Sequence, residues 1–119
     1  MTFARKIGAE RPKEIALRDE NNTYTWLEVD ENLNRAANGL LDMDLGDNKR
    51  IAVFSENSAE TAFANLAGLI SGASVVPVNF HLAADEVAYI LNDSNAQVLF
   101  ADSKTLERAV DAAKQSKVH

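Results

Sequence analysis

Three runs of apolar residues, each the length of a β-strand, recur in the second half of the chain: IAVFS at 51–55, VVPVN at 75–79 and VLFAD at 98–102. A run that is apolar at every position is typical of a strand buried on both faces of a sheet. Three segments with helical periodicity alternate with the runs, at 58–71, 84–92 and 104–117. This alternation predicts right-handed crossovers and a short parallel sheet covered by helices on both faces. The predicted fold class is therefore α/β, with three layers in the order α-β-α.

The apolar spacing within each helical segment predicts the face that the helix turns toward the sheet. The expected inward residues are Ala62, Phe63, Leu66, Ala67 and Ile70 in the first helix, Val87, Ile90 and Leu91 in the second, and Leu106, Ala109, Val110 and Ala113 in the third. These side chains are the candidate core on the two faces of the sheet.

The first half of the chain predicts an N-terminal β-hairpin followed by a helix. Residues 1–14 are polar and irregular, and IALRD and TYTW then flank the turn-prone Asn-Asn pair at 21–22. The segment TWLE at 25–28 fits a capping box, in which the Thr25 hydroxyl and the Glu28 carboxylate each accept a hydrogen bond from the other residue's backbone N–H. A helix should therefore begin at Trp26 and end near Gly46. Its apolar stripe comprises Trp26, Val29, Leu33, Ala36, Ala37, Leu40 and Leu41.

The composition fits one α/β domain, residues 1–119, and excludes several classes of function. With 119 residues, of which 46% are hydrophobic and 25% charged, the chain is long enough to bury a core. Its formal net charge of -6 argues against nucleic-acid binding, which depends on clustered Lys and Arg. No cysteine is present, and no apolar run reaches the roughly 18 residues that cross a bilayer. We expect a cytoplasmic protein with no transmembrane segment and no nucleic-acid partner.

The sequence contains no recognisable nucleotide-binding or metal-binding motif. Its five glycines never form GxGxxG or GxxxxGK, the loops whose backbone amides cradle phosphate. A single internal histidine, His81, and no cysteine leave too few ligands for a transition metal. Asp102 ends a strand as the phospho-acceptor of a receiver domain does, but no acidic pair for Mg²⁺ follows IAVF, where residues 55–57 read SEN. We predict no catalytic residue and no metal ligand, and we expect Asp102 or Ser103 to cap the last helix.

Two further groups have both a binding and a structural interpretation. The segment NSAE at 57–60 lies at the carboxyl end of a strand, where open α/β sheets bind ligands. It also reads as a helix N-cap with Glu60 at the third helical position, and we favour this structural interpretation. Tyr24 and Trp26 have the rings to stack on a ligand, but their spacing is more typical of core residues.

The residues Asn79, Phe80 and His81 follow the second apolar strand directly. At this point the backbone changes direction and side chains face the crevice where ligands bind in α/β proteins. A histidine on the surface or at the start of a helix is the more common alternative, and the residues alone favour it.

Taken in order, these segments resemble the beginning of the adenylate-forming acyl-CoA synthetase superfamily, the AMP-binding enzymes. The segment TYTWLEVDENLNRAANGL resembles the family's opening TYxEL…NRxAxxL block. The segment from NKRIAVF to VLFAD resembles its block RVAVxxxNSxE…GAxxVPxN…YILxDSxA. The resemblance extends from about Ile15 to Asp102. Carrier-dependent adenylation domains usually continue from the glycine as AYVPID, whereas ASVVPVN is closer to fatty-acyl or aryl CoA ligases.

The resemblance implies an N-terminal fragment of a fatty-acyl or aryl CoA ligase. The parent enzyme would convert a carboxylic or fatty acid, ATP and CoA into acyl-CoA, AMP and pyrophosphate, with Mg²⁺. The family's Ser/Thr/Gly-rich phosphate loop, YGxTE segment, TGD aspartate and C-terminal lysine are absent from this sequence. The chain by itself would then be catalytically incomplete and would hold no cofactor of its own.

In related acetyl-CoA synthetases, the loop after the second of these strands touches the nucleotide part of CoA. The resemblance therefore implies that Asn79, Phe80 and His81 face CoA, although those relatives carry Phe-Gly-Gly there. The partner would be the remainder of the parent enzyme, and we expect the isolated fragment to form a homo-oligomer that covers its exposed sheet. The alternative is a stand-alone, non-catalytic α/β binding or interaction module.

Overall fold

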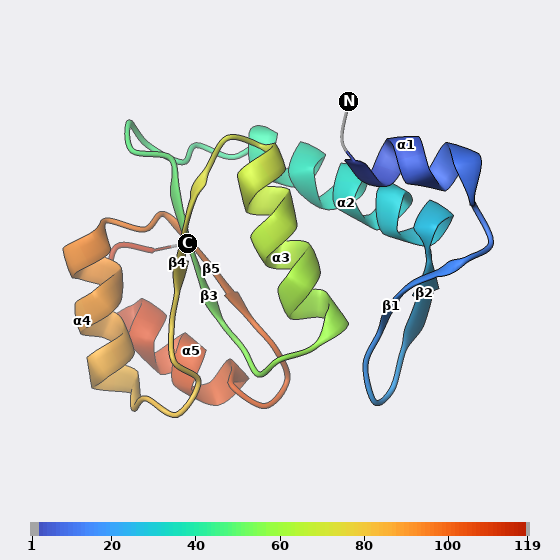
Figure 1. The fold of residues 1–119 in the computed structure, drawn as a ribbon. Coiled ribbons are helices and arrows are strands. Elements are labelled where there is room, and N and C mark those ends of the chain that lie inside the picture. Colours follow the sequence, from blue (N-terminus) through green and yellow to red (C-terminus); the bar gives the residue numbers. More distant parts are fainter. Residues whose placement is uncertain (1–2, 119) are drawn as a thin grey trace.

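A computed structural model describes residues 3–118 and shows an N-terminal region beside a three-layer α/β unit (Figure 1). In chain order, the elements are α1 (Phe3–Glu10), β1 (Ile15–Arg18), β2 (Thr23–Thr25), α2 (Trp26–Leu41), β3 (Arg50–Phe54), α3 (Ala59–Ile70), β4 (Ser74–Pro77), α4 (Ala84–Ser94), β5 (Val98–Ala101) and α5 (Leu106–Lys114). The three predicted strands and the helices between them are all present, which confirms the alternation read from the sequence.

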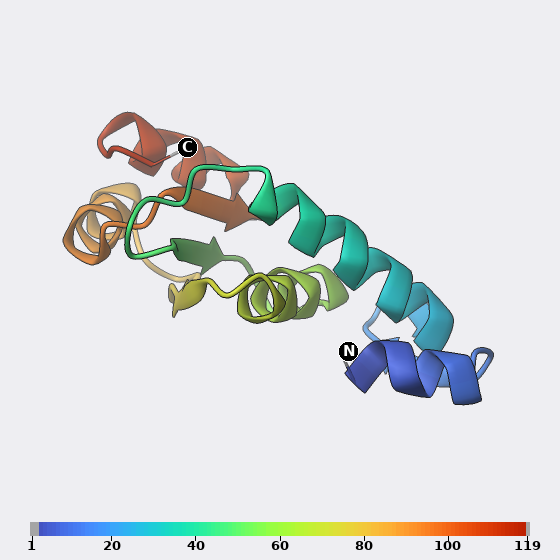
Figure 2. The same ribbon diagram turned by 90° about the horizontal axis from the view of Figure 1, so that it is seen from above.

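The three-stranded sheet has the order β4-β3-β5, and both strand pairs are parallel. Ile51 of β3 lies beside Val75 of β4 and Val98 of β5. Helices α4 and α5 cover one face of the sheet, and α3 with the C-terminal part of α2 covers the other (Figure 2). The predicted α-β-α layering is confirmed.

The central strand alone is buried on both faces. Residues 51–54 of β3 are at most 4% exposed, and they alternate between the two cores. Ala52 and Phe54 pack against the α4 and α5 side, whereas Ile51 packs toward α2 and α3. Strands β4 and β5 form the edges of the described sheet and are partly exposed.

Helix α3 approaches the sheet closely because it carries a glycine where it crosses the strands. A Cβ atom at Gly68 would lie 2.6 Å from Ile51 Cδ1 and 2.7 Å from Val75 Cγ2. Non-bonded carbon atoms do not approach this closely, so a side chain here would require Ile51 and Val75, or the helix itself, to move.

The N-terminal region contains the predicted hairpin and one helix that was not predicted. Strands β1 and β2 pair antiparallel, which confirms the hairpin. The expectation of an irregular segment before it was wrong, because residues 3–10 form α1. This helix buries the small residues Ala4 and Gly8 against α2, and a Cβ at Gly8 would lie 3.2 Å from the Trp26 carbonyl oxygen. A contact made by small residues leaves no large apolar stripe in the sequence.

The capping box at the start of α2 is confirmed. The backbone N–H of Glu28 donates to Thr25 Oγ1 at 3.3 Å, and the backbone N–H of Thr25 donates to Glu28 Oε2 at 2.8 Å. The predicted end near Gly46 was wrong, because α2 ends at Leu41, whose side chain is 64% exposed. A turn follows, in which Gly46 has a positive φ and donates to Asp44 Oδ1.

The predicted inward face of the last helix was partly wrong. Leu106 and Val110 are 55% and 44% exposed, whereas Ala109 and Ala112 are buried against the sheet side. Buried Thr105, just before α5, lies on the same side because its hydroxyl binds the end of β3. That bond and the small alanines set the rotation of α5, so the larger apolar residues point outward.

The predicted inward face of α3 was also partly wrong, whereas that of α4 is confirmed. Phe63 and Ala67 of α3 are buried as expected, but Ala62 is only partly buried and Ile70 is 36% exposed. Burial of Ala64 and Gly68 turns the helix toward its smaller residues. In α4, Val87 and Leu91 are buried and Ile90 packs against the same core, as predicted.

Candidate functional site

The loop after β4 presents the predicted site residues toward the surface. Asn79 and His81 are exposed, and Phe80 is partly buried against the core under α4 and α5. The Asn79 side chain closes a turn, since its Oδ1 accepts from the backbone N–H of His81 at 3.0 Å. The rings of Phe80 and His81 have centroids 4.1 Å apart and are tilted by 38°. The structure therefore brings the three residues together as one surface group with an aromatic pair.

Arg108 of α5 holds this loop from inside. Its Nη1 donates to the carbonyl oxygens of Phe80 and Leu82 at 2.7 and 2.6 Å. Its guanidinium carbon lies 5.1 Å from the centre of the buried Phe54 ring. No local pattern in the sequence indicates this contact, because 26 to 28 residues separate the donor from its acceptors.

At the end of β3, by contrast, the polar side chains bind one another. The Thr61 hydroxyl donates to the Glu56 carbonyl oxygen at 2.5 Å and lies 2.6 Å from Ser55 Oγ and 3.0 Å from Ser58 Oγ. Ser58 also caps α3 by accepting from the backbone N–H of Thr61 at 3.2 Å. The structural interpretation of NSAE as a helix start is confirmed for Ser58.

Asp102, at the end of β5, ties the ends of two strands together. Its carboxylate accepts from the backbone N–H groups of Glu56, Lys104 and Thr105 at 2.9 to 3.0 Å. Burial raises the pKa of Asp102, but these backbone donors and the Thr105 hydroxyl outweigh it and leave the pKa below its ordinary value. The N-cap position of α5 is Thr105, so the expectation that Asp102 or Ser103 occupies it was wrong. Asp102 instead binds the turn that leads into the helix.

Thr105 is the centre of this connection. It is 1% exposed, and its hydroxyl donates to the Phe54 carbonyl oxygen at 2.6 Å while lying 3.0 Å from Asp102 Oδ1. A hydroxyl in the core is stable only when it is hydrogen-bonded, and this one joins β3 to the start of α5.

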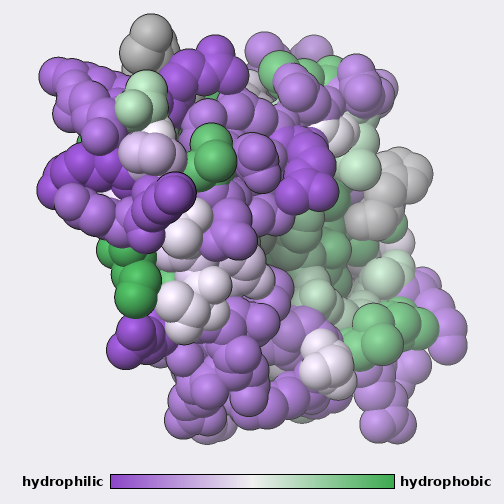
Figure 3. All heavy atoms as spheres, turned by 90° about the vertical axis from the view of Figure 1, so that its right-hand side faces the viewer, coloured by the Kyte–Doolittle hydropathy of each residue, from purple (hydrophilic) through white to green (hydrophobic). Residues whose placement is uncertain are grey.

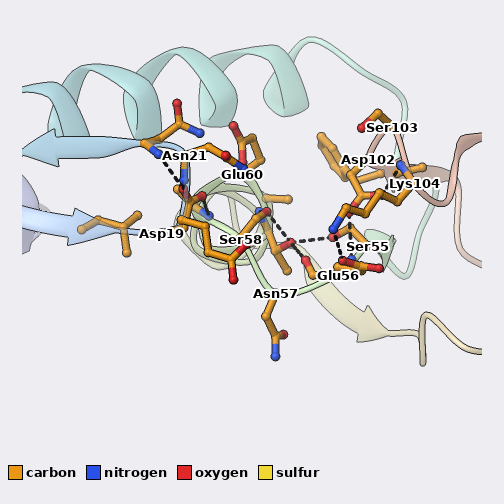
Figure 4. A pocket seen from close by; sticks show the side chains of 18 of the residues that line it. Asp19, Asn21, Ser55, Glu56, Asn57, Ser58, Glu60, Asp102, Ser103 and Lys104 are labelled. Atoms are coloured by element: carbon orange, nitrogen blue, oxygen red, sulfur yellow. Dashed lines mark hydrogen bonds and ion pairs between the residues drawn. The ribbon is translucent and has the colours of Figure 1, made fainter.

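The turn of the β-hairpin reaches the same place from the N-terminal region (Figure 4). Asp19 Oδ2 accepts from the backbone N–H of Ala59, the first residue of α3, at 2.8 Å. This bond and those from the backbone N–H groups of Asn21 and Asn22 hold the pKa of Asp19 below its ordinary value. A carboxylate beside a helix N-terminus is also favoured by the helix dipole.

A hollow of about 850 Å³ lies between the hairpin turn, the start of α3 and the end of β5. Its lining includes acidic Asp19, Glu56 and Asp102 beside Lys104, whose Nζ lies 2.6 Å from Glu56 Oε2. From the side of the hairpin, the molecule shows a mainly polar surface with a recess that is hydrophobic in its depth (Figure 3). The hollow is open, and its polar groups largely bind one another, so we assign no ligand to it.

The aromatic residues near the hairpin are used in packing. Tyr24 meets Phe63 edge to face, with centroids 5.0 Å apart, and Trp26 meets Phe3 in the same manner at 6.2 Å. The core interpretation of Tyr24 is confirmed, because it is partly buried and packs against the cluster that contains Phe63 and Val29.

Within residues 3–118, no group of three or more carboxylate or histidine side chains is arranged to hold a metal ion. None of the helices in the same range is long and apolar enough to cross a membrane.

Comparison with known proteins identifies the family. A family model described as AMP-binding enzyme matches residues 4–119. The hybrid PKS-NRPS synthetase pydA of Acremonium sp. is 36% identical over 106 residues, covering 88% of this chain and 2% of that protein. Surfactin synthase subunit 1 of Bacillus subtilis is 32% identical over 104 residues, covering 87% of this chain and 3% of that protein. The chain therefore spans a small fraction of these relatives.

Solved structures show the same fold. A benzoate CoA ligase from Burkholderia xenovorans superimposes with a TM-score of 0.88 at 20% identity, over 98% of this chain and 24% of the ligase. A fatty acyl CoA synthetase from Mycobacterium tuberculosis superimposes with a TM-score of 0.82 at 25% identity, over 97% of this chain and 24% of the synthetase. The fold is that of the N-terminal region of adenylate-forming enzymes, and the chain belongs to the AMP-binding enzyme family.

Proposed function

We propose that this chain is the N-terminal part of an ATP-dependent acyl-CoA synthetase that joins a carboxylic acid to CoA. The match to the AMP-binding family over residues 4–119 is the observation that carries the proposal. The sequence lacks the family's phosphate loop and catalytic lysine. ATP, Mg²⁺ and the fatty or aryl acid would therefore be bound by the rest of the enzyme, and this part would supply scaffold and one wall of the CoA site.

In this proposal, the group Asn79, Phe80 and His81 contacts the nucleotide part of CoA. The fit rests on chemistry that the loop displays. The exposed His81 imidazole, backed by the Phe80 ring, offers a flat face, and purine rings stack on such faces. The exposed Asn79 side chain keeps its amide N–H donors for a base edge or a ribose, because its Oδ1 is already used by the loop.

A second candidate function is carrier-dependent adenylation, as in peptide synthetases. The specific observation that favours it is the 36% and 32% identity to the two multidomain synthetases described above. The sequence VVPVN at the end of β4 favours the CoA ligases instead. The two candidates share acyl-adenylate formation and differ in the thiol that accepts the acyl group.

The test begins with the coding sequence downstream of His119, which should continue into a Gly-rich loop ending in Pro-Lys. The full-length enzyme is then assayed for pyrophosphate exchange with fatty, aryl and amino acids, and for thioester formation with free CoA. Exchange with fatty or aryl acids together with a CoA thioester supports the proposal. Exchange with amino acids and no CoA thioester would replace it with the carrier-dependent function.

Alanine substitutions at Asn79, Phe80 and His81 in that enzyme test the proposed CoA contact. They should raise the KM for CoA and leave pyrophosphate exchange unchanged, because exchange reports only the adenylation step. A parallel fall in both reactions would assign the residues a structural role.

The isolated 119-residue chain distinguishes an enzyme fragment from a stand-alone module. We expect no measurable binding of ATP with Mg²⁺ in isothermal titration calorimetry. We also expect a homo-oligomer in light scattering over a dilution series, because β4 and β5 are the edges of the described sheet and unpaired edges recruit other chains. A chain that stays a folded monomer at high concentration would favour the module, and measurable ATP binding would contradict the first expectation.

A further inference from the structure

We propose that Arg108 is a positioning residue for the loop formed by residues 79–82, and that it affects the CoA step without affecting adenylation. The part concerning CoA rests on the proposed function. The part concerning the loop rests on the contacts of Arg108 alone.

The first step is the pair of hydrogen bonds that Arg108 donates to the loop. Arg108 Nη1 donates to the carbonyl oxygens of Phe80 and Leu82, the two residues on either side of His81. Hydrogen bonds from a charged donor are about twice as strong as neutral ones. With both flanking carbonyls directed at α5, the loop is fixed with the His81 side chain at the surface.

The second step is that the sheet determines where the guanidinium lies. Its carbon atom lies 5.1 Å from the centre of the Phe54 ring, which is fully buried at the end of β3. A cation over an aromatic face is attracted to it. The ion pairs found within residues 3–118 do not include Arg108, so no carboxylate competes with the two carbonyls. Arg108 thus transmits the position of β3 to the loop.

The chain offers a matched control at the other end of the same strand. Arg50 begins β3, and its Nη1 donates to the Ser94 carbonyl oxygen at 2.8 Å. Like Arg108, it is partly buried and joins the sheet region to a distant main-chain carbonyl. Its acceptor closes α4 and does not belong to the loop at 79–82.

The experiment uses Arg108→Met, Arg108→Lys and Arg50→Met in the full-length enzyme. Methionine keeps the aliphatic packing and removes the donors, whereas lysine keeps the charge. We expect Arg108→Met to raise the KM for CoA about tenfold, with pyrophosphate exchange within about twofold of the wild type. Arg108→Lys should recover part of the loss. Hydrogen exchange of a peptide covering the loop should accelerate in Arg108→Met, because the Leu82 N–H is held by Asn79 O in the intact turn.

The outcomes separate this inference from the proposed function. Unchanged loop exchange in Arg108→Met, or equal acceleration in Arg50→Met, would overturn the positioning role whatever the enzyme does. Faster loop exchange together with an equal fall in adenylation would overturn the restriction to the CoA step. Faster loop exchange in an enzyme that makes no CoA thioester would support the positioning role and overturn the proposed function.

Discussion

The carboxyl ends of the three parallel strands are built in two different ways. At the ends of β3 and β5, polar side chains bind the backbone and one another, with Thr105 buried at the centre and Asp102 accepting from three backbone N–H groups. After β4, Asn79 and His81 are exposed, and the loop is held from behind by Arg108. The comparison shows that polar side chains at the ends of β3 and β5 are used within the fold, whereas the side chains of Asn79 and His81 after β4 remain exposed.

The largest expected effect on stability comes from Thr105, which lies at the centre of the hydrogen bonds between the ends of β3 and β5. Thr105→Val keeps the shape of the side chain and leaves the Phe54 carbonyl and the Asp102 carboxylate without the hydroxyl. We expect the free energy of unfolding to fall by about 2 kcal/mol, because a buried acceptor loses its donor. Denaturant unfolding at neutral pH measures the change. Ser103→Ala, at an exposed neighbour, is the control, and equal effects of the two substitutions would contradict the role of Thr105.

A smaller effect should follow from removing the cap of α3. Ser58→Ala should reduce the free energy of unfolding by about 1 kcal/mol, because the Thr61 N–H loses its side-chain acceptor. Thr25→Ala removes the same kind of cap from α2, away from the strand ends, and should cost about 1 kcal/mol as well. Denaturant titration of both variants measures the two losses of unfolding free energy. A change below about 0.3 kcal/mol in Thr25→Ala would argue against the capping box.

Part of the pH dependence of stability should come from Asp102, where the ends of β3 and β5 meet. The pKa of Asp102 is lowered below 3.8 in the folded protein, so its stabilising contribution is fully present above that value and is lost as the pH falls through the folded pKa. The difference in unfolding free energy between wild type and Asp102→Asn should therefore be constant at neutral pH and should shrink below about pH 4. A difference that grows on acidification would show that folding raises the pKa of Asp102.

The smallest effect on stability should come from the loop after β4. Asn79→Ala and His81→Ala remove exposed side chains and should each change the free energy of unfolding by less than about 0.5 kcal/mol. Thermal or denaturant unfolding provides the measurement. A loss of unfolding free energy as large as that of Thr105→Val would mean that Asn79 and His81 have a structural role.

Local pattern was sufficient to predict the strands and helices of the α/β unit and the start of α2. The IAVFS run became the buried central strand, and TWLE became a capping box, because both depend on residues close together in the chain. Helix α1 was missed because its buried contacts are made by Ala4 and Gly8, which carry almost no hydrophobic signal. The rotation of α5 was missed because it depends on the Thr105 bond to β3, which joins residues 51 positions apart.

The sequence was sufficient to predict the position of the candidate site but not the contacts that hold it. The end of β4 and the residues Asn79 to His81 could be read from the sequence, and the structure brings these residues together at the surface. Arg108 could not be found in the same way, because an arginine within a helix reads as a solvent-exposed residue. Its hydrogen bonds to the loop form only when α5 packs against the sheet.

The Asp19 bond to Ala59 joins the hairpin to a helix that begins 40 residues later. If the hairpin separated from the rest of the chain, the first turn of α3 would lose this carboxylate and the edge-to-face contact between Tyr24 and Phe63. These contacts join the N-terminal region to the sheet unit, so loss of structure in the hairpin should spread to α3. We therefore expect the two regions to unfold in a single transition.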